Sequence, residues 1–350
     1  MPVKNRLRRD NLIRILESLW LYPNKSRADL ARELRLDRST VGVIIDKMIE
    51  LGILEQHADD FTGPKGGRPP ILLNIVSGYA YSIGVELTYP HIRLNAVDLS
   101  GKFLGSRDIP IKTYGPQSID TLAVETARLR ASLDSSFTSG PGLVTIGIGV
   151  SGVVDDIDKE IILSDALHIT TPLSVAEPLE TVLQVPITLL NDAQASVLRE
   201  AGLRRKQELL LIQVEFRSQG SLEDIGIGVG LVIRNQLIHG RSIRHLLGPG
   251  DSEKSESMDQ FIEDLGHSLA LVANVTGIDE IVLGGGEEIL EPLESSIALH
   301  ATRQGLDGKN YISISRVSGG GDAVASGAAY AALKFLFSSL SFPLYLSETS

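Results

Sequence analysis

Arg38, Ser39 and Thr40 are three consecutive side chains that can donate hydrogen bonds, and they directly follow the acidic Asp37. An aspartate at this point predicts a helix N-cap, so the three residues would form the first turn of the helix. A guanidinium there could reach a guanine edge or a phosphate, and hydroxyls near a helix N-terminus could meet phosphate oxygens. This pattern is typical of side chains that contact a nucleic acid.

Apolar residues at three- and four-residue spacing predict the helix that positions them, and Gly52 predicts its end. The residues that share the predicted buried face are Val41, Ile44, Ile45 and Met48. If this face packs against the core, Val43 and Lys47 are exposed on the opposite side together with Arg38. Ser26 predicts the N-cap of a shorter preceding helix, with Asp29 three residues on. Two short helices joined by a tight turn predict a helix-turn-helix; the alternative is a two-helix packing unit with a solvated polar face.

The flanking segments favour the helix-turn-helix. Residues 11–20 predict a further helix, and residues 53–56 and 71–75 predict two strands. Between these strands lies a Gly/Pro-rich segment that carries Lys65 and Arg68, which predicts a wing with a cationic tip that could enter a minor groove. The alternative reading of this segment is a linker.

Charge divides the chain. Residues 1–74 hold 13 basic and 10 acidic side chains, a net of +3, whereas the remainder holds 20 and 34, a net of −14. Only the N-terminal part therefore suits a polyanion. The chain has no cysteine, which excludes disulfides and thiolate metal sites. No apolar run reaches about 18 residues, and we expect a cytoplasmic protein without a membrane segment.

Alternating strands and helices are predicted from Tyr79 onward. Three consecutive strands start near Tyr81, and a similar start recurs near Leu209. This repetition predicts two similarly built lobes with a ligand in the cleft between them.

In this order the motifs resemble the repressor, open reading frame and kinase (ROK) family over almost the whole chain. The helix-turn-helix followed by GGRPP looks like that of the family's regulators. Residues 225–240 (IGIGVGLVIRNQLIHG), 189–195 (LLNDAQA) and 281–286 (IVLGGG) are similar to its glycine-rich, Asn-Asp and nucleotide-side motifs. The resemblance implies an α/β chain: an N-terminal winged helix-turn-helix, then a two-lobed actin-like ATPase (ribonuclease H-like) fold. The expected domains are residues 1–76, the first lobe 77–190 with the C-terminal helix at about 322–350, and the second lobe 191–321.

The chain departs from the family's kinases where ATP phosphates would bind. Kinases have an aspartate and a Gly-Gly-Thr turn there, whereas this chain has Glu86 followed by Leu87, Thr88, Tyr89 and Pro90. Phosphates need bare backbone N–H groups, and proline has none to give. Because phosphoryl transfer depends on such positioning, we expect a non-catalytic body.

The resemblance also implies ligand-binding residues. Asp192 matches the family's catalytic aspartate, Asn191 stands beside it, and Asp165 falls where a sugar-binding asparagine is usual. An Asn-Asp pair at a strand-to-helix junction is equally typical of an ordinary N-cap. Residues 241–259 lack the family's glutamate and its cysteine zinc loop, so we expect no metal and no cofactor. His245 is then expected to be a surface or packing residue, and His267, within a predicted helix, to be a core residue.

The resulting prediction is a DNA-binding transcriptional regulator of carbohydrate genes, a repressor acting on a double-stranded operator. Its body would form a homodimer or homotetramer and bind a sugar or a sugar derivative. The alternatives are an active sugar kinase of the same family and a regulator whose body is only an oligomerisation scaffold.

Overall fold

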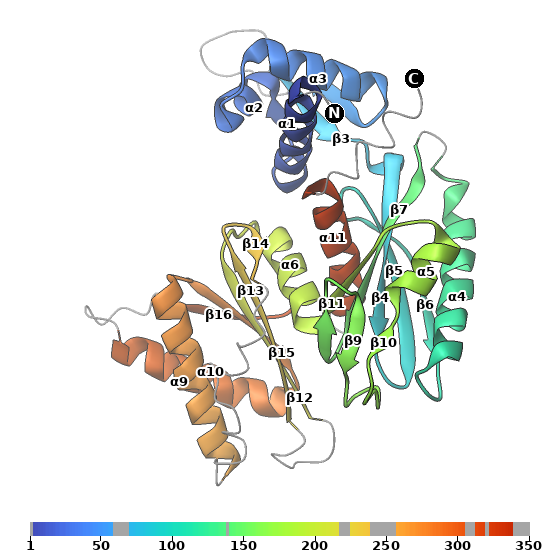
Figure 1. Cartoon of the computed structure of the whole chain (residues 1–350). Helices are drawn as coiled ribbons and strands as arrows, with labels where there is room; N and C mark the ends of the chain where they lie inside the picture. The colour runs from blue at the N-terminus through green and yellow to red at the C-terminus, as the bar shows by residue number, and fades with distance from the viewer. Residues whose placement is uncertain are drawn as a thin grey trace.

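The computed structural model describes residues 3–58, 70–137, 140–216, 225–238, 257–304, 312–318 and 322–338. Three parts follow one another along the chain: a helical part with a three-stranded sheet, and two α/β units that each contain a five-stranded sheet (Figure 1). None of the helices in these ranges combines the length and the apolar character that crossing a membrane requires.

The N-terminal part is a winged helix-turn-helix. Its elements are α1 (Val3–Leu21), β1 (Lys25–Ser26), α2 (Arg27–Leu34), α3 (Arg38–Glu50), β2 (Leu54–Ala58) and β3 (Ile71–Ile75). β3 pairs antiparallel with both β1 and β2. Ser26 begins α2 with the predicted capping box, because its hydroxyl accepts from the Asp29 N–H and Asp29 accepts from the Ser26 N–H. The two helices and the two strands are thus confirmed near the predicted residues.

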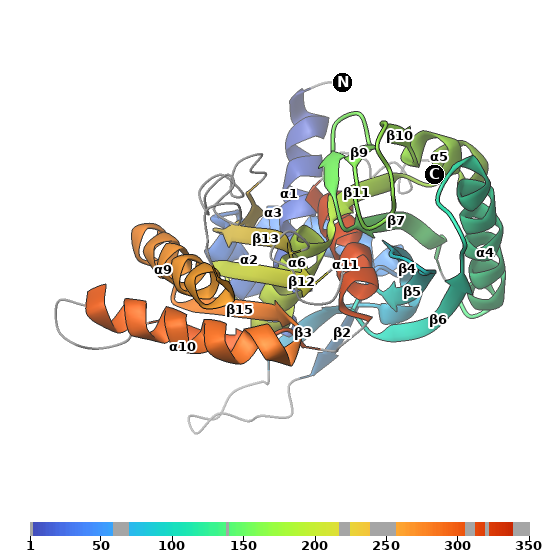
Figure 2. The same cartoon turned by 90° about the horizontal axis from the view of Figure 1, so that it is seen from below.

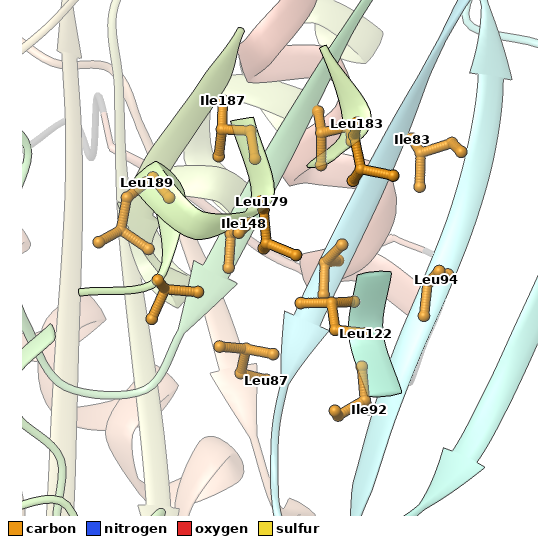
Figure 3. Packing of buried hydrophobic residues seen from close by; sticks show 14 of the residues in the cluster. Ile83, Leu87, Ile92, Leu94, Leu122, Ile148, Leu179, Leu183, Ile187 and Leu189 are labelled. Carbon is orange, nitrogen blue, oxygen red and sulfur yellow. The ribbon is translucent and has the colours of Figure 1, made fainter. Parts of the chain in front are cut away.

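The first α/β unit follows a short helix η1 (Ser77–Tyr79) and has the strand order β11-β7-β4-β5-β6. Its elements are β4 (Ala80–Leu87), β5 (His91–Asp98), β6 (Phe103–Pro110), α4 (Pro116–Asp134), β7 (Gly142–Val150), α5 (Ala176–Leu183) and β11 (Ile187–Asn191). α4 and α5 cover one face of the sheet (Figure 2). Apolar side chains such as Ile83, Leu122 and Leu179 meet in the core between them (Figure 3).

Helix α11 (Ala323–Ser338) covers the other face of this sheet. A methyl group on Gly84 would lie 1.8 Å from the Ala325 carbonyl oxygen, and one on Gly147 would lie 1.9 Å from that of Ala328. Glycine at both strand positions therefore lets the backbone of α11 rest directly on the sheet.

A small sheet projects from the first unit and was not predicted from the sequence. It consists of β8 (Val153–Asp155), β9 (Glu160–Leu163) and β10 (Leu173–Ser174), in the order β10-β9-β8. These strands have two to four residues each, which is too short for an alternating pattern to stand out.

The second α/β unit repeats the strand pattern of the first, with the order β14-β13-β12-β15-β16. Its elements are α6 (Asp192–Arg204), β12 (Leu209–Phe216), β13 (Ile225–Ile233), β14 (Gln236–Leu237), α9 (Met258–Thr276), β15 (Glu280–Gly285), α10 (Glu287–Gln304) and β16 (Ser313–Arg316). In each unit an antiparallel three-strand meander is extended by two parallel strands. The prediction of two similarly built lobes is confirmed.

The winged helix-turn-helix shares one hydrophobic core with the first unit and α11. In this cluster Leu19 and Ile45 of the N-terminal part belong together with Leu99, next to β5, and with Leu333 and Phe337 of α11. Figure 1 shows α11 directly below the N-terminal helices. The sequence did not predict this continuity, because the contributing residues are far apart along the chain.

Candidate nucleic-acid interface and ligand site

Helix α3 presents its N-terminal end and one face to solvent. Arg38 and Ser39 are exposed, Thr40 is half-buried, and Val43 is 64% exposed. The buried residues on the opposite face are the four that the sequence predicted, Val41, Ile44, Ile45 and Met48. An apolar residue as exposed as Val43, beside three hydrogen-bonding side chains, is suited to contact with a thymine methyl group in a major groove.

The remainder of α3 is braced by ion pairs. Arg27 of α2 lies 2.7 Å from the Asp46 carboxylate, and it also donates to the Gly42 carbonyl at 3.5 Å. Lys47 is exposed, with its ammonium 3.2 Å from the Glu50 carboxylate. Because an exposed pair of this kind contributes little, Lys47 can exchange Glu50 for another anion.

Asp37 stands at the N-cap of α3 with an extended backbone, as predicted, but its side chain makes no capping hydrogen bond. The predicted side-chain cap is therefore wrong. The first-turn N–H groups of α3 lack this carboxylate as an acceptor, and such groups are suited to a phosphate oxygen.

The wing is present as the hairpin of β2 and β3, in which Ala58 pairs with Ile71. Lys65 and Arg68 belong to the segment that joins these strands and lie outside the described residues. Their predicted contact with a minor groove stays a prediction.

The second candidate site lies at the carboxyl edge of the parallel strands in the first unit. Val150 at the end of β7 is paired with Leu87 on one side and with Asn191 on the other. The loops that leave β4, β7 and β11 therefore start side by side. In open α/β sheets this edge is the usual place for a ligand.

Asn191 makes the N-cap of α6. Its Oδ1 accepts from the Ala193 N–H at 2.9 Å, while Gln194 accepts from the Asn191 N–H at 3.0 Å. Its Nδ2 donates to the Gly152 carbonyl at 2.9 Å, which ties α6 to the loop after β7. The capping role is therefore observed, and it uses one of the two lone pairs of the amide oxygen that a sugar hydroxyl would need.

Asp192 is the better placed of the two for a ligand. It is 6% exposed, and its Oδ1 accepts from the Ala193 N–H at 2.7 Å. A methyl on Gly228 of β13 would lie 3.2 Å from the same oxygen, so the carboxylate is positioned against the glycine-rich strand of the second unit. The side chain thus lies where the two units meet.

Asp165 lies in an exposed turn after β9. The neighbouring Ser164, which the sequence did not single out, anchors that turn because its hydroxyl donates to the Ser151 carbonyl at 2.6 Å. Since Gly152 follows Ser151 and is bonded to Asn191, one chain of hydrogen bonds links the turn of Asp165 to the start of α6. A buried serine in a short turn gives no periodic signal in the sequence.

The segment after β4 is a closed turn. The Thr88 N–H donates to the His91 carbonyl at 3.2 Å, and the His91 N–H donates to the Thr88 carbonyl at 3.0 Å. Pro90 has no N–H, so of the four residues from Thr88 to His91 at most Tyr89 has an N–H available to a ligand. Tyr89 is 51% exposed, and its ring lies edge-on to His168 in the turn of Asp165, with centroids 6.1 Å apart.

The Glu86 carboxylate is not isolated but forms a cross-strand ion pair. Arg93 on β5 is its register partner and lies 3.4 Å from it. The charge of Glu86 raises the pKa of the nearby Tyr114, in addition to the larger effect of burial. Tyr114 donates to the Thr88 carbonyl at 2.7 Å and so stabilises the closed turn.

His267 is not the core residue that the sequence predicted. It is exposed on α9, and its Nδ1 lies 3.3 Å from Nδ1 of His300 on α10. The helical pattern could not reveal this pair, because its members lie 33 positions apart. Across the described residues, no group of three or more His, Cys, Asp or Glu side chains is arranged to hold a metal ion. The segment with His245 lies outside these residues.

Two protein-family models match this chain. The pattern of the ROK family matches residues 82–245, and that of a winged helix-turn-helix DNA-binding domain matches residues 8–55.

Among curated proteins, the chain is 25% identical over 232 residues to the xylose repressor of Staphylococcus xylosus, covering 66% of this chain and 57% of that protein. It is 21% identical over 220 residues to the xylose repressor of Bacillus subtilis, covering 62% and 53%. The chain thus spans little more than half the length of these relatives.

The solved structures that share the fold include a regulator and a kinase. A ROK family transcriptional regulator, a homologue of the E. coli Mlc protein, has a TM-score of 0.71 at 16% identity, covering 98% of this chain and 99% of that chain. A ROK hexokinase from Thermus thermophilus has a TM-score of 0.56 at 18% identity, covering 74% of this chain and 100% of that chain. The fold of the body therefore occurs in a transcriptional regulator as well as in a hexokinase.

Proposed function

We propose that this chain is a ROK family regulator, a sequence-specific repressor of carbohydrate genes; its match to the ROK family model and to a winged helix-turn-helix DNA-binding domain supports this. One observation carries this proposal: α3 exposes Arg38, Ser39 and Val43 on a helix whose opposite face is fully packed. A helix presented in this way, in the only net-basic part of the sequence, is suited to the major groove. As a DNA-binding protein it would act in the cytoplasm.

The proposed DNA contacts follow from the position of each side chain along α3. Arg38 would read a base edge or a phosphate, Ser39 and Thr40 would bind phosphate oxygens, and Val43 would contact a thymine methyl. Lys47 lies about one turn beyond Val43 and suits the phosphate backbone. Lys65 and Arg68 of the wing are proposed to reach the adjacent minor groove.

The body is proposed to bind its ligand without phosphorylating it. The closed turn leaves at most the Tyr89 N–H for a phosphate, and Glu86 is engaged by Arg93. An ATP triphosphate needs several converging N–H groups or cations, and these residues do not offer them. An assay of ATP turnover with a panel of pentoses and hexoses tests this point directly, and turnover of any of them would refute it.

The ligand is proposed to be a neutral sugar held at the carboxyl edge of the first sheet. Asp192 supplies a buried carboxylate between the two units, and Asp165 supplies an exposed one across the loop of Ser151. Carboxylates are suited to pairs of vicinal hydroxyls because each has two acceptor oxygens. Asn191 is assigned a supporting role, since its amide oxygen already caps α6. D-xylose is the first sugar to test, because the curated relatives are xylose repressors.

The assembly is proposed to be a homodimer or homotetramer on a palindromic operator. Two copies would place their α3 helices about 34–36 Å apart, or a multiple of that distance. We place the domain boundaries at residues 1–76, 77–190 with about 322–350, and 191–321.

The experiment is genomic footprinting of the purified protein at near-physiological salt, followed by titration of the best site with D-xylose and other sugars. A palindrome beside carbohydrate genes that one sugar releases would support the whole proposal. A palindrome that no sugar disturbs would favour a body that serves only as a scaffold. The absence of any specific site would refute the DNA-binding function.

A further inference from the structure

Helix α6 of the second unit packs between β13 of its own sheet and α11 on the first unit, with close backbone contacts on both sides. A methyl on Gly327 of α11 would lie 2.5 Å from the Ala195 carbonyl oxygen, and one on Gly230 of β13 would lie 2.3 Å from that of Ala193. Such contacts leave no side chain that could rearrange to absorb a displacement. A movement of β13 relative to α11 must therefore move α6 as well.

Ion pairs and hydrogen bonds join α6 to the sheet of the second unit. Arg204 lies 2.5 Å from the Glu280 carboxylate at the start of β15, and it also binds Glu200 at 2.8 Å. Glu200 is fully buried and accepts from the Ser318 N–H at 3.0 Å, just beyond β16. The Arg204–Glu280 pair and the Glu200–Ser318 hydrogen bond therefore tie the C-terminal half of α6 to the second sheet, so we expect α6 to move together with the second unit.

The two ends of α6 lie at different functional places. Its first residue, Asp192, belongs to the proposed ligand site. With 13 residues the helix is about 20 Å long. Near its other end, a methyl on Gly202 would lie 2.0 Å from the hydroxyl oxygen of Tyr330 on α11.

Tyr330 in turn contacts the DNA-binding domain. Its ring is stacked on Trp20 of α1, with centroids 4.4 Å apart and an angle of 27° between the planes. Trp20 also contacts Phe337, with centroids 5.3 Å apart. At the same corner, the buried Lys334 of α11 donates to the carbonyl of Asn235, in the turn between β13 and β14. One patch of α11 thus joins α1 to the second unit.

We propose that α6 and Tyr330 are the route by which a ligand at the Asp192 edge alters the DNA-binding domain. A rotation of the second unit would carry the C-terminal end of α6 past Tyr330, and the stack with Trp20 would repack between two arrangements. The inference rests on the proposed function and names how its two sites are connected. Such a route requires evidence of coupling, not only of contact.

Trp20 is the only tryptophan of the chain, so its fluorescence reports this corner directly. Gly202→Ala is the local perturbation, and we expect it to shift the emission maximum and to increase quenching by acrylamide. Gly266→Ala is its matched control, because a methyl there would lie 2.2 Å from the Ser296 hydroxyl oxygen, between α9 and α10. The control is expected to leave the Trp20 signal unchanged.

The decisive variant lies at the opposite end of the helix. Asn191→Ala removes the cap of α6 and its bond to Gly152, and it is expected to change Trp20 quenching from about 20 Å away. Ser257→Ala is its control: it removes the N-cap of α9, where the serine accepts from the Gln260 N–H at 3.2 Å. An Asn191→Ala protein that folds like the wild type, judged by circular dichroism, with unchanged Trp20 fluorescence would overturn the proposal.

These measurements need neither an operator nor a sugar. The protein could bind a palindrome and release it with a sugar while Asn191→Ala leaves the Trp20 fluorescence unchanged. This result would support the proposed function and refute the route through α6. Conversely, Asn191→Ala could change the Trp20 fluorescence of a protein that binds no specific site. This result would support the route through α6 and refute the proposed function.

Discussion

Leu333→Ala tests whether the DNA-binding domain and the first α/β unit share one core. Leu333 is fully buried on α11, in the cluster that also contains Leu19 of α1, Ile45 of α3 and Leu99 beside β5. If that cluster is continuous, a cavity at Leu333 must weaken the packing of both parts together.

The expected loss follows from the size of the cavity. The substitution removes three carbon atoms, each worth about 0.8 kcal/mol when buried, and the surrounding backbone of α11 on the sheet limits collapse around the gap. A loss of about 3–4 kcal/mol is therefore expected, within the range found for buried leucines. Because 1.4 kcal/mol is a factor of ten, slow-exchanging amides should lose two to three decades of protection.

Hydrogen exchange followed by mass spectrometry measures this loss peptide by peptide. We expect peptides of α3 and of β4 to lose the same protection in Leu333→Ala. The control is Leu269→Ala on α9, which is equally buried but belongs to the core of the second unit. Wild-type protection of α3 in Leu333→Ala, beside a loss in β4, would show that the domain is packed independently and that the reasoning is wrong.

Three further perturbations address the proposed sites. Arg38→Ala should weaken operator binding by about 1–3 kcal/mol in fluorescence anisotropy, whereas Arg128→Ala on the distant α4 should not; equal affinities would remove Arg38 from the interface. Asp192→Ala should abolish release of the operator by sugar without lowering operator affinity in its absence, and an undiminished response would leave Asp192 no role in binding. Hydrogen bonds from Ser26 hold the pKa of Asp29 below its usual value of 3.8, so its stabilisation is complete above that pH and is lost as the pH falls through the lowered pKa. Asp29→Asn should therefore flatten the acid side of the melting temperature against pH, and an unchanged profile would contradict the assignment.

Local patterns predicted the helix-turn-helix well because its signals lie within a few residues of one another. Ser26 and Asp29 form the expected capping box, and the strand Ile71–Ile75 begins and ends where the apolar run does. Capping and periodicity depend on neighbours in sequence, so no tertiary information is needed to read them.

The candidate ligand site could be predicted only in part. The sequence located Asn191 and Asp192 at a strand-to-helix junction. It could not show which of them caps the helix and which is placed to bind a ligand. That division depends on Gly152 and Gly228, which contact the pair from distant parts of the chain. The turn of Ser164 escaped prediction for the same reason, since its hydrogen bond joins segments without any shared pattern.

The shared core limits how this protein can respond to a ligand. A DNA-binding domain on a free linker could swivel, but here Leu19 and Leu333 lie in one cluster and Trp20 is stacked on Tyr330. Packed interfaces of this kind change between discrete arrangements and do not deform continuously. In a dimer, a small rotation at this corner would displace α3, and the displacement would grow with the distance of α3 from the twofold axis. Because an operator fixes the separation of two recognition helices at about 34–36 Å or a multiple, a shift of a few ångströms at α3 is enough to lose one half-site. A repacking of Trp20 against Tyr330 that leaves the rest of the core folded could therefore control operator binding.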